Sequence, residues 1–383
     1  MLSPDLVVTR LTLTDFRNYR TLRLENHAPM LVLTGPNGAG KTNLLEAISM
    51  LMPGRGLRGA ALSELARIGG AGGWAVAAKI SERESEVSLG TAYAANPGDE
   101  LLNGARDVVI DGEKAPAADL ADHFRCIWLV PAMDRLFAGP GGDRRRFVDR
   151  LVQAFDPSHG TRVAAFEKLM RDRNIVLADT IPDSAWLNGL ESQMAEAGTA
   201  IAAGRRTAIE SLRHRMALAR AASPFPWSAI AIEGEIEAFL ETMPAVKAED
   251  EYRRILVDSR PLDRAAGRTL RGPHRSDFLV VHGPTATKAA LCSTGEQKAL
   301  LIGLLLAHAS SVKEARGAAP VLLLDEVAAH LDAARRDALF ATLTGLGSQV
   351  WMTGTDEALF QTLGSDAEFL HVEAGIVTAS ARI

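Results

Sequence analysis

The chain of 383 residues contains only two cysteines, Cys126 and Cys292, which lie far apart and have no paired spacing. A disulfide framework or a thiolate metal site requires several cysteines at short or regular spacings, so the sequence excludes both. Such scarcity of cysteine is typical of proteins of a reducing compartment. We therefore expect the protein to be cytoplasmic.

Signals for export and for membrane insertion are also missing. The N-terminus alternates apolar and polar residues from Val7 to Leu13, unlike a signal peptide, in which an apolar stretch follows a charged one. The longest apolar runs, such as residues 300–307, are too short to span a bilayer. We therefore expect no membrane partner.

The sequence has no internal repeat, no low-complexity tract and no heptad array of coiled-coil length. Its formal net charge is −5, so any surface that binds a polyanion must be local. Apolar residues make up 47% and charged residues 23%, which is ordinary globular composition. The length suffices for one large or two medium domains.

Strand and helix patterns predict an α/β fold in two lobes. Strands are expected at 9–16, 30–34, 74–80, 86–92, 106–111, 127–130, 278–281, 321–324 and 350–353. Helical spacing dominates residues 143–220, with breaks at Asp156-Pro157 and Ile181-Pro182. We expect 1–130 plus 268–383 to form one domain with a mixed sheet and an antiparallel β subdomain. A mostly helical second lobe at 131–267 would interrupt it.

A complete phosphate-binding P-loop follows the strand at 30–34. It consists of Gly35, Pro36, Asn37, Gly38, Ala39, Gly40, Lys41 and Thr42. Glycines let the backbone come close enough for its N–H groups to point at phosphate oxygens. Lys41 is expected to reach the β- and γ-phosphates, and the Thr42 hydroxyl to ligate Mg²⁺. The helix that begins there would present its positive end to the triphosphate.

Two carboxylates, Asp325 and Glu326, end the apolar strand at 321–324. Asp325 is placed to hold the Mg²⁺ shell, and Glu326 to polarise the attacking water as a general base. Alone, an Asp-Glu pair after a strand is usually a solvated turn. The P-loop upstream favours the catalytic interpretation, with Glu326 and Lys41 as the catalytic residues.

A third motif, Ser293-Thr294-Gly295-Glu296-Gln297-Lys298, precedes an apolar-faced helix about 30 residues before the Asp-Glu pair. Ser followed three residues later by Glu is also an ordinary capping box. The position is that of the signature motif of ABC-type ATPases. In that arrangement Ser293 and the Gly295 backbone face the γ-phosphate of ATP held by the other subunit, so the site would be split across an ATP-dependent homodimer.

Two further segments fit the same class of ATPase. Residues 329–332 match a D-loop. Most ABC ATPases have a switch histidine near 352–356, where this chain has none. Thr353 or Thr355 is expected to take its place by hydrogen bonding.

The chain resembles the RecF family of bacterial recombination-repair proteins, which are relatives of the SMC proteins. The matching segments are 11–19, the P-loop, 131–136, 143–149, 272–277, 293–298 and 325–326. The more specific ones contain Arg144-Arg145-Arg146-Phe147 and Gly272-Pro273-His274-Arg275. There are two departures: Cys292 replaces the usual leucine, and Ser276 stands where an acid is frequent.

The resemblance implies a P-loop ABC-type ATPase domain that binds ATP and Mg²⁺. It also implies a weak, DNA-stimulated ATPase whose ATP-driven dimer clamps DNA at gaps and single-strand/double-strand junctions. Such a clamp would promote recombinase loading and the SOS response with recombination mediator partner proteins, and slow hydrolysis would trigger its release.

Candidate DNA contacts come from the residues themselves. On the predicted helix, Arg206, Arg213 and Arg220 recur every seven residues and share one face, a plausible phosphate-contacting stripe. Arg55 and Arg58, in a Gly-rich loop, are a second candidate. The other interpretation of both sets is a solvated basic surface paired with acids elsewhere. No aromatic stacking platform is evident, so we expect sequence-tolerant binding to duplex, single-stranded or gapped DNA.

Other classes of protein explain fewer of these motifs. A P-loop kinase has no need of a signature helix, and an SMC protein requires a long coiled coil. The main alternative is an ABC-type ATPase subunit that acts on a protein or membrane partner. A dimer that ATP holds together without hydrolysis also remains open.

Overall fold

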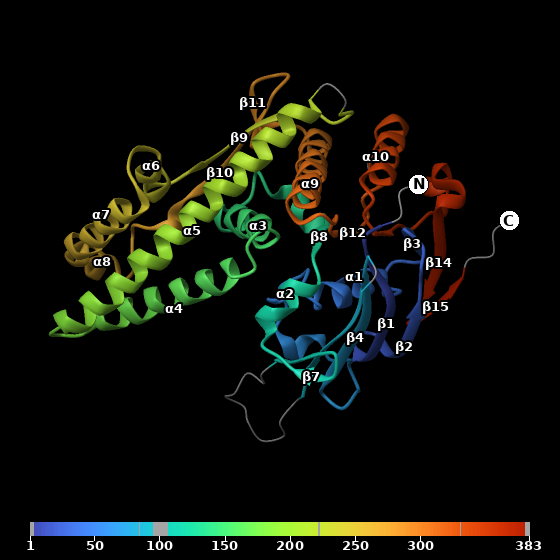
Figure 1. The fold of residues 1–383 in the computed structure, drawn as a ribbon, viewed down its shortest axis with the longest axis horizontal. Coiled ribbons are helices and arrows are strands. Elements are labelled where there is room, and N and C mark those ends of the chain that lie inside the picture. The colour runs from blue at the N-terminus through green and yellow to red at the C-terminus, as the bar shows by residue number, and fades with distance from the viewer. Residues whose placement is uncertain (1–3, 84, 95–105, 221–222, 330, 380–383) are drawn as a thin grey trace. The chain divides into compact units, whose positions relative to one another are not determined.

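The computed structural model describes residues 4–83, 85–94, 106–220, 223–329 and 331–379 (Figure 1). The chain divides into two units, the first formed by Met1–Asp134 with Leu301–Ile383 and the second by Arg135–Leu300. No helix in the described ranges is both long and apolar enough to cross a bilayer.

A six-stranded, mainly parallel sheet in the first unit has the order β15-β14-β3-β13-β12-β8. Its strands are β3 (Met30–Thr34), β8 (Cys126–Leu129), β12 (Val321–Leu324), β13 (Val350–Thr353), β14 (Ala367–Glu373) and β15 (Ile376–Ala379). Strands from both ends of the sequence therefore lie side by side, as β3 and β14 do in Figure 1. Strands β3, β12 and β13 are wholly buried, which explains their continuous apolar runs.

The second sheet of this unit is antiparallel and has the order β2-β1-β4-β5-β6-β7. Its strands are β1 (Leu6–Phe16), β2 (Tyr19–Glu25), β4 (Trp74–Glu82), β5 (Ser85–Tyr93), β6 (Arg106–Ile110) and β7 (Glu113–Lys114). Buried and more exposed residues alternate along β4, as expected for a sheet with one covered face. A turn at Asp111-Gly112 joins β6 to β7, with positive φ at both residues.

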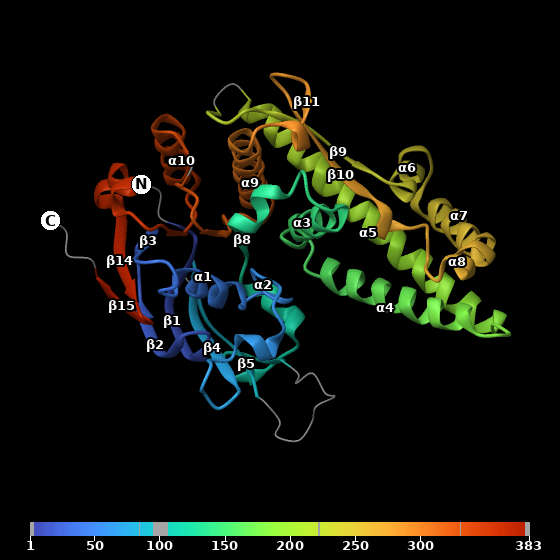
Figure 2. The same cartoon turned by 180° about the vertical axis from the view of Figure 1, so that it is seen from behind.

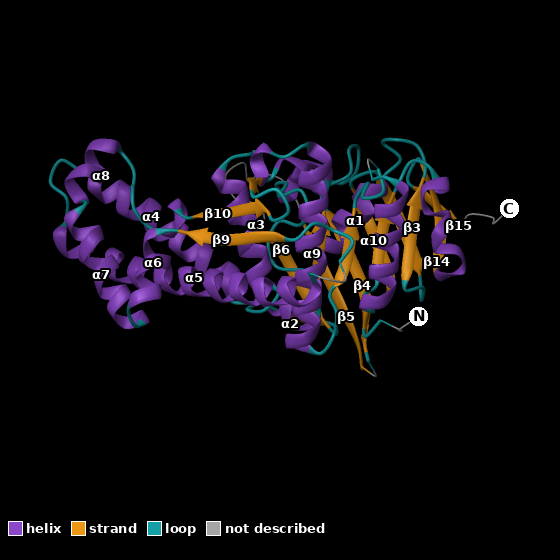
Figure 3. Cartoon of the chain, turned by 90° about the horizontal axis from the view of Figure 1, so that it is seen from above, coloured by secondary structure: helices purple, strands orange, loops and turns teal. Residues whose placement is uncertain are grey.

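The helices of the first unit include the one that follows the P-loop. They are α1 (Lys41–Ser49), α2 (Leu120–His123) and α10 (Ala333–Leu346), with 3₁₀ turns η1 (Leu62–Leu65), η2 (Ala117–Asp119) and η6 (Glu357–Asp366). Helix α1 buries Leu44, Leu45 and Ile48. Figure 3 distinguishes these helices from the strands of the two sheets.

The second unit is dominated by helices, as predicted. They are α3 (Gly141–Gln153), α4 (His159–Ala178), α5 (Ser184–Ala219), α6 (Glu235–Thr242), α7 (Ala245–Asp258) and α8 (Arg260–Ala266). The breaks expected at Asp156-Pro157 and Ile181-Pro182 separate α3 from α4 and α4 from α5. Helices α4 and α5 run side by side in both Figure 1 and Figure 2.

A three-stranded antiparallel sheet in this unit departs from the expected organisation. It pairs β9 (Ser228–Glu233), β10 (Asp277–His282) and β11 (Thr287–Lys288) in the order β11-β10-β9. Strand β9 was not predicted, and β10 was expected in the ATPase domain. Because β10 pairs with β9, residues 268–300 group with the second unit rather than with the first.

The elements not yet named are the 3₁₀ turns η3 (Pro131–Arg135), η4 (Pro273–Arg275) and η5 (Ala289–Leu291) and helix α9 (Thr294–Arg316).

The two most specific segments of the sequence contact each other within the second unit. Arg144 donates from Nε and Nη2 to the two carboxylate oxygens of Asp277 at 2.7 and 2.8 Å. Arg145 donates to the carbonyl of Ser276 at 2.9 Å. The hydrogen bond from Arg144 lowers the pKa of Asp277. The Arg-rich segment therefore joins α3 to the start of β10.

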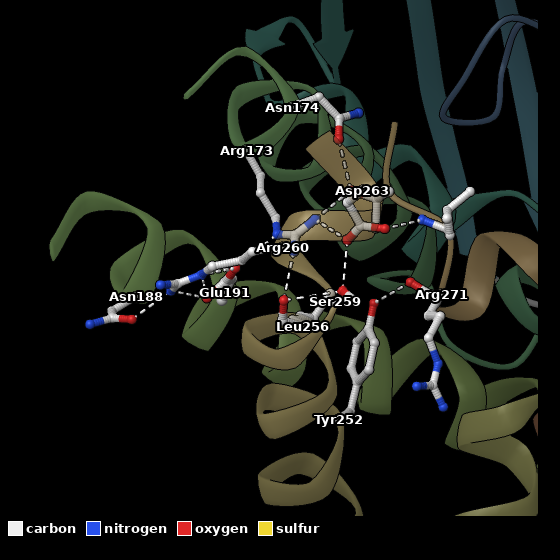
Figure 4. A network of polar contacts seen from close by, with 12 residues as sticks. Arg173, Asn174, Asn188, Glu191, Tyr252, Leu256, Ser259, Arg260, Asp263 and Arg271 are labelled. Atoms are coloured by element: carbon white, nitrogen blue, oxygen red, sulfur yellow. Dashed lines mark hydrogen bonds and ion pairs between the residues drawn. The ribbon is translucent and has the colours of Figure 1, made fainter. Parts of the chain in front are cut away.

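A buried cluster of charges joins α4, α5, α7 and α8 (Figure 4). Arg173 is 0% exposed and lies between two carboxylates, with Nε 3.0 Å from Glu191 and Nη1 2.7 Å from Asp263. Arg260 also binds Glu191. Ser259 donates to Asp263 at 2.7 Å. Two positive and two negative groups thus compensate one another away from water.

Removing the central cation of this cluster should destabilise the second unit strongly. Arg173→Met leaves Glu191 and Asp263 with fewer donors in a buried site, at a cost of about 3–5 kcal/mol in the free energy of unfolding. Arg253→Met, which breaks only an exposed pair with Asp250, should cost less than about 1 kcal/mol. Urea unfolding of both variants measures the difference. Equal losses would show that burial of the Arg173 cluster makes no difference to stability.

Candidate nucleotide-binding site

The P-loop backbone adopts conformations that favour glycine. Gly35, Gly38 and Gly40 have φ values of 137°, 81° and 119°. A Cβ at Gly35 would lie 2.1 Å from the carbonyl oxygen of Val372, and one at Gly40 would lie 2.5 Å from Nδ2 of Asn18. Two of the three glycines are therefore required both for conformation and for space.

The side chain of Lys41 lies folded over this loop. Its Nζ donates to the carbonyls of Gly35 at 2.7 Å and Pro36 at 2.9 Å, and the residue is only 5% exposed. Burial lowers the pKa of Lys41, while the carboxylates of Glu326 and Asp325 act in the opposite direction. The loop thus holds a cation where the N–H groups at the start of α1 also favour an anion.

Asp325 brings together the ends of three elements. Its Oδ1 and Oδ2 lie 2.9 and 3.1 Å from the Thr42 hydroxyl at the start of α1. The Thr353 hydroxyl, at the end of β13, donates to Oδ1 at 2.7 Å. The predicted partners Thr42 and Asp325 are therefore in contact. Hydroxyl and carboxylate oxygens are ligands that Mg²⁺ prefers.

Glu326 adopts a conformation that is unusual for its residue type. Its φ is 51°, and its backbone N–H donates to the Thr353 hydroxyl at 2.9 Å. A residue other than glycine in this region carries strain, which persists only where its surroundings impose it. Thr353 thus contacts both Asp325 and Glu326, whereas Thr355 is exposed. Of the two threonines considered for the switch position, Thr353 is the one in contact with the carboxylate pair.

Three polar residues around the P-loop were missed as site residues by sequence reasoning. Asn18 donates from Nδ2 to the Ala39 carbonyl at 2.8 Å, and Tyr19 donates to the Gly40 carbonyl at 3.1 Å. Asn43 donates to Oδ1 of Asn18 at 2.8 Å. Asn18 and Tyr19 belong to the 11–19 segment that carries part of the family resemblance. That membership was the available signal, because no spacing rule links them to the P-loop.

Arg58 contacts the P-loop helix. Glu46 on α1 is 0% exposed and accepts two bonds from Arg17, at 2.8 and 2.9 Å, and one from Arg58 at 3.0 Å. Arg58 also donates to Asn43 at 2.8 Å. Its side chain remains 41% exposed.

Arg55 is exposed and has no ion pair among the residues that the structure describes. Arg106 on β6 holds the segment that precedes Arg55, because it donates to the carbonyls of Met50, Met52 and Gly54. Burial lowers the pKa of Arg106 to about 10. The loop that presents Arg55 is thus anchored to the antiparallel sheet.

The three arginines of α5 have different partners. Arg206 pairs with Glu210 at 3.3 Å. Arg213 donates from Nε to the Ile230 carbonyl at 2.6 Å, and Arg220 lies 3.9 Å above the Trp227 ring. Their common helix face is therefore not a uniform stripe of unoccupied cations.

Ser293 caps the N-terminus of α9. Its hydroxyl and backbone N–H both bond to Oε2 of Glu296, at 2.8 and 2.9 Å, and the Glu296 N–H returns to the hydroxyl at 3.3 Å. The capping-box interpretation is thus confirmed, and Ser293 is exposed. A Cβ at Gly295 would meet nothing within 4 Å. Within the segment 329–332, His330 lies outside the described residues.

Comparison with known proteins identifies the family of this chain. The model of the RecF/RecN/SMC N terminal domain matches residues 7–377. Over 371 residues the chain is 50% identical to the DNA replication and repair protein RecF of Mesorhizobium japonicum, covering 97% of each chain. The chain belongs to the RecF family. It is also 51% identical over 379 residues to RecF of Brucella suis, covering 98% of this chain and 97% of that relative.

Solved structures agree with the RecF assignment at the level of the fold. The recombination mediator protein RecF-ATPrS matches with a TM-score of 0.84 and 24% identity, covering 99% of each chain. An Smc head domain from Pyrococcus furiosus matches with a TM-score of 0.54 and 15% identity, over 98% of this chain and 96% of that one. The predicted α/β fold of the P-loop ABC-type ATPase is therefore confirmed.

The double contact of Thr353 leads to a prediction about stability. Thr353→Val keeps the shape but removes a donor from Asp325 and an acceptor from Glu326, so the free energy of unfolding should fall by about 1–3 kcal/mol. Thr342→Val makes the same chemical change on α10, where the hydroxyl bonds only to the Ala338 carbonyl, and should have little effect. Chemical denaturation compares the two. If both variants lose the same amount, the Thr353 contacts contribute no net stability.

Proposed function

We propose that this chain is an ATP-dependent DNA-binding protein of DNA replication and recombinational repair. The observation that carries the ATP assignment is the contact of Asp325 with Thr42, which joins a P-loop to a strand ending in two carboxylates. The DNA assignment rests on relatives about half identical over nearly the whole chain, whose names are those of DNA replication and repair proteins.

The residues of the loop fit a nucleoside triphosphate with Mg²⁺. Lys41 and the N–H groups at the start of α1 would bind phosphate oxygens. No cluster of three or more His, Cys, Asp or Glu side chains suited to a metal occurs in the described part of the chain. That fits Mg²⁺, which proteins hold through one or two side chains together with substrate phosphates, in this case Thr42 and Asp325. When bound, Mg²⁺ neutralises negative charge on the β- and γ-phosphates.

Glu326 is the residue best placed to act as general base. In hydrolysis its carboxylate accepts a proton from the attacking water, whose oxygen bonds to the γ-phosphorus. The bond from the γ-phosphorus to the bridging oxygen breaks, giving ADP and phosphate. Thr353 fixes the Glu326 backbone, so this threonine positions the base. The expected rate is slow, because hydrolysis here would time the release of DNA.

A second protomer would complete the site. Ser293 and the Gly295 backbone lie at an exposed helix N-terminus, which can accept an anion from another molecule. ATP would thus act as part of the dimer interface and close a clamp. Recognition of gaps and junctions, recombinase loading with mediator proteins and support of the SOS response are proposed on the family resemblance.

Arg55 and Arg58 are the proposed DNA contacts in the first unit. Arg55 is exposed on an anchored loop, and Arg58 is partly exposed although paired. In the second unit Arg206 remains a candidate because its pair with Glu210 is long and partly exposed.

The decisive experiment is fluorescence anisotropy with gapped, duplex and single-stranded DNA, with ATP or ADP, over a range of salt. ATP-dependent binding that weakens with salt would support the clamp, and the slope would count the phosphates neutralised. Absence of ATP-dependent DNA affinity at low salt would overturn the DNA assignment. It would favour the alternative, an ABC-type ATPase that acts on a protein or membrane partner.

Glu326→Gln should retain ATP binding but slow turnover by at least about 100-fold, because the amide cannot accept the proton. We expect an ATP-bound dimer to accumulate, and DNA bound with ATP to dissociate more slowly. Phosphate release and light scattering measure the two effects. Normal turnover in this variant would remove Glu326 as the base.

Ser293→Arg should separate nucleotide binding from dimerisation. The bulky cation stands at the proposed interface and far along the chain from the P-loop, so ATP affinity should remain within about twofold while the ATP-dependent dimer is lost. Equilibrium dialysis and sedimentation provide the two readouts. A Ser293→Arg variant that still dimerises with ATP would contradict the split site.

A further inference from the structure

Two residues at the connection from β1 to β2 bind the backbone of the P-loop. The Asn18 side chain donates from Nδ2 to the Ala39 carbonyl at 2.8 Å, and the Tyr19 hydroxyl donates to the Gly40 carbonyl at 3.1 Å. Both side chains also lie directly against Gly40, because a Cβ there would stand 2.5 Å from Asn18 Nδ2 and 2.7 Å from the Tyr19 hydroxyl oxygen. They therefore hold two successive peptide groups of the loop.

These two contacts determine where the next two N–H groups of the loop point. In a planar trans peptide group the C=O bond and the N–H bond that follows it point in opposite directions. Holding the Ala39 carbonyl thus directs the Gly40 N–H away from Asn18, and holding the Gly40 carbonyl directs the Lys41 N–H away from Tyr19. Neither N–H donates to another residue in the described part of the chain. Two such donors at the start of a helix are suited to phosphate oxygens.

The connection that presents Asn18 has a strained backbone. Arg17 has a φ of 54°, a region that a residue other than glycine occupies only where its surroundings impose it. Its N–H donates to the Leu65 carbonyl at 2.7 Å, and its side chain is paired with the buried Glu46. The conformation of Arg17 is therefore fixed from two sides, and with it the position of the next residue, Asn18.

The contacts of Asn18 and Tyr19 do not depend on the Lys41 side chain. Lys41 Nζ binds two other carbonyls of the loop, and it has to leave both of them in order to reach a phosphate. Tyr19 is 0% exposed, and burial raises its pKa, so its hydroxyl keeps the proton that it donates. Asn18 Oδ1 accepts from Asn43 at 2.8 Å, which fixes the orientation of the amide. Both contacts can therefore persist when Lys41 moves.

We propose that Asn18 and Tyr19 are positioning residues for the phosphates of the nucleotide. They hold the loop so that the N–H groups of Gly40 and Lys41 point at phosphate oxygens before the nucleotide arrives. Donors that are already in place bind more tightly, because less order has to be gained on binding. The backbone of a P-loop contacts the α- and β-phosphates, which ATP and ADP share, so the affinity for both nucleotides depends on the two residues. This inference rests on the proposed binding of ATP.

The test compares two tyrosines in the full chain. Tyr19→Phe removes one hydroxyl and keeps the ring, and the dissociation constants of ATP and of ADP with Mg²⁺ should each rise by about fivefold, because one hydrogen bond that holds the loop is lost. The matched control is Tyr252→Phe. Tyr252 is also 0% exposed, and its hydroxyl donates to the Arg271 carbonyl at 3.3 Å in the second unit. This control should leave both dissociation constants unchanged in titration calorimetry.

Two further readouts distinguish positioning from a purely structural role. The kcat of Tyr19→Phe should stay within about twofold of that of the unaltered protein, because Glu326 is not changed. With ADP bound, residue-resolved amide exchange should become faster at Gly40 and Lys41 in this variant, whereas the amide of Leu343 on α10 should not change. Asn18→Leu, which replaces the other contact by an apolar side chain of similar size, should weaken both nucleotides in the same way.

Loss of affinity for both nucleotides in Tyr19→Phe and Asn18→Leu, but not in Tyr252→Phe, is the expected result. Unchanged affinities in the first two variants would overturn the inference and leave the proposed function intact. A loss for ATP without a loss for ADP would also overturn it, because the effect would then lie at the γ-phosphate. If the unaltered protein binds neither nucleotide, the proposed function fails, and this inference fails with it.

Discussion

The site depends on one buried carboxylate and the two hydroxyl groups that satisfy it. Asp325 is only 6% exposed, and a charge so placed is costly unless it is hydrogen-bonded. Thr42 and Thr353 provide these bonds, and they come from the segments that follow β3 and complete β13. Parallel pairing of β3, β13 and β12 brings the carboxyl ends of all three strands to one edge of the sheet, where such contacts can form. The positions of Lys41 and Glu326 follow from this arrangement.

The sequence was sufficient for features determined by short, local patterns. The P-loop, the apolar strands around it and the breaks between the long helices were predicted because glycine, proline and apolar runs act on the backbone where they stand. Thr42 and Asp325 were each predicted to ligate Mg²⁺, and in the structure their side chains are in contact. The confirmed capping box at Ser293 is equally local. The roles of these residues in hydrolysis remain predictions.

Features that depend on distant partners could not be predicted. The seven-residue spacing placed Arg206, Arg213 and Arg220 on one helix face, and geometry fixes no more than that. Each arginine contacts a different group: Arg206 a carboxylate, Arg213 a carbonyl and Arg220 an indole. The carbonyl belongs to β9, whose short alternating sequence gave no prediction. Because β9 was not predicted, residues 268–300 were assigned to the ATPase domain. In the structure β10, which lies within them, pairs with β9 in the second unit.

An ion pair with an acid does not by itself prevent an arginine from binding DNA, and the contacts of Glu46 explain why. Its buried carboxylate receives two hydrogen bonds from Arg17, so the negative charge stays compensated without Arg58. The Arg58 side chain is 41% exposed, although the Glu46 carboxylate is fully buried. Because Arg17 remains bound to Glu46, Arg58 can exchange Glu46 for a phosphate without leaving that carboxylate unpaired. The bond of Arg213 differs, because releasing it would leave the carbonyl of the buried Ile230 without its donor.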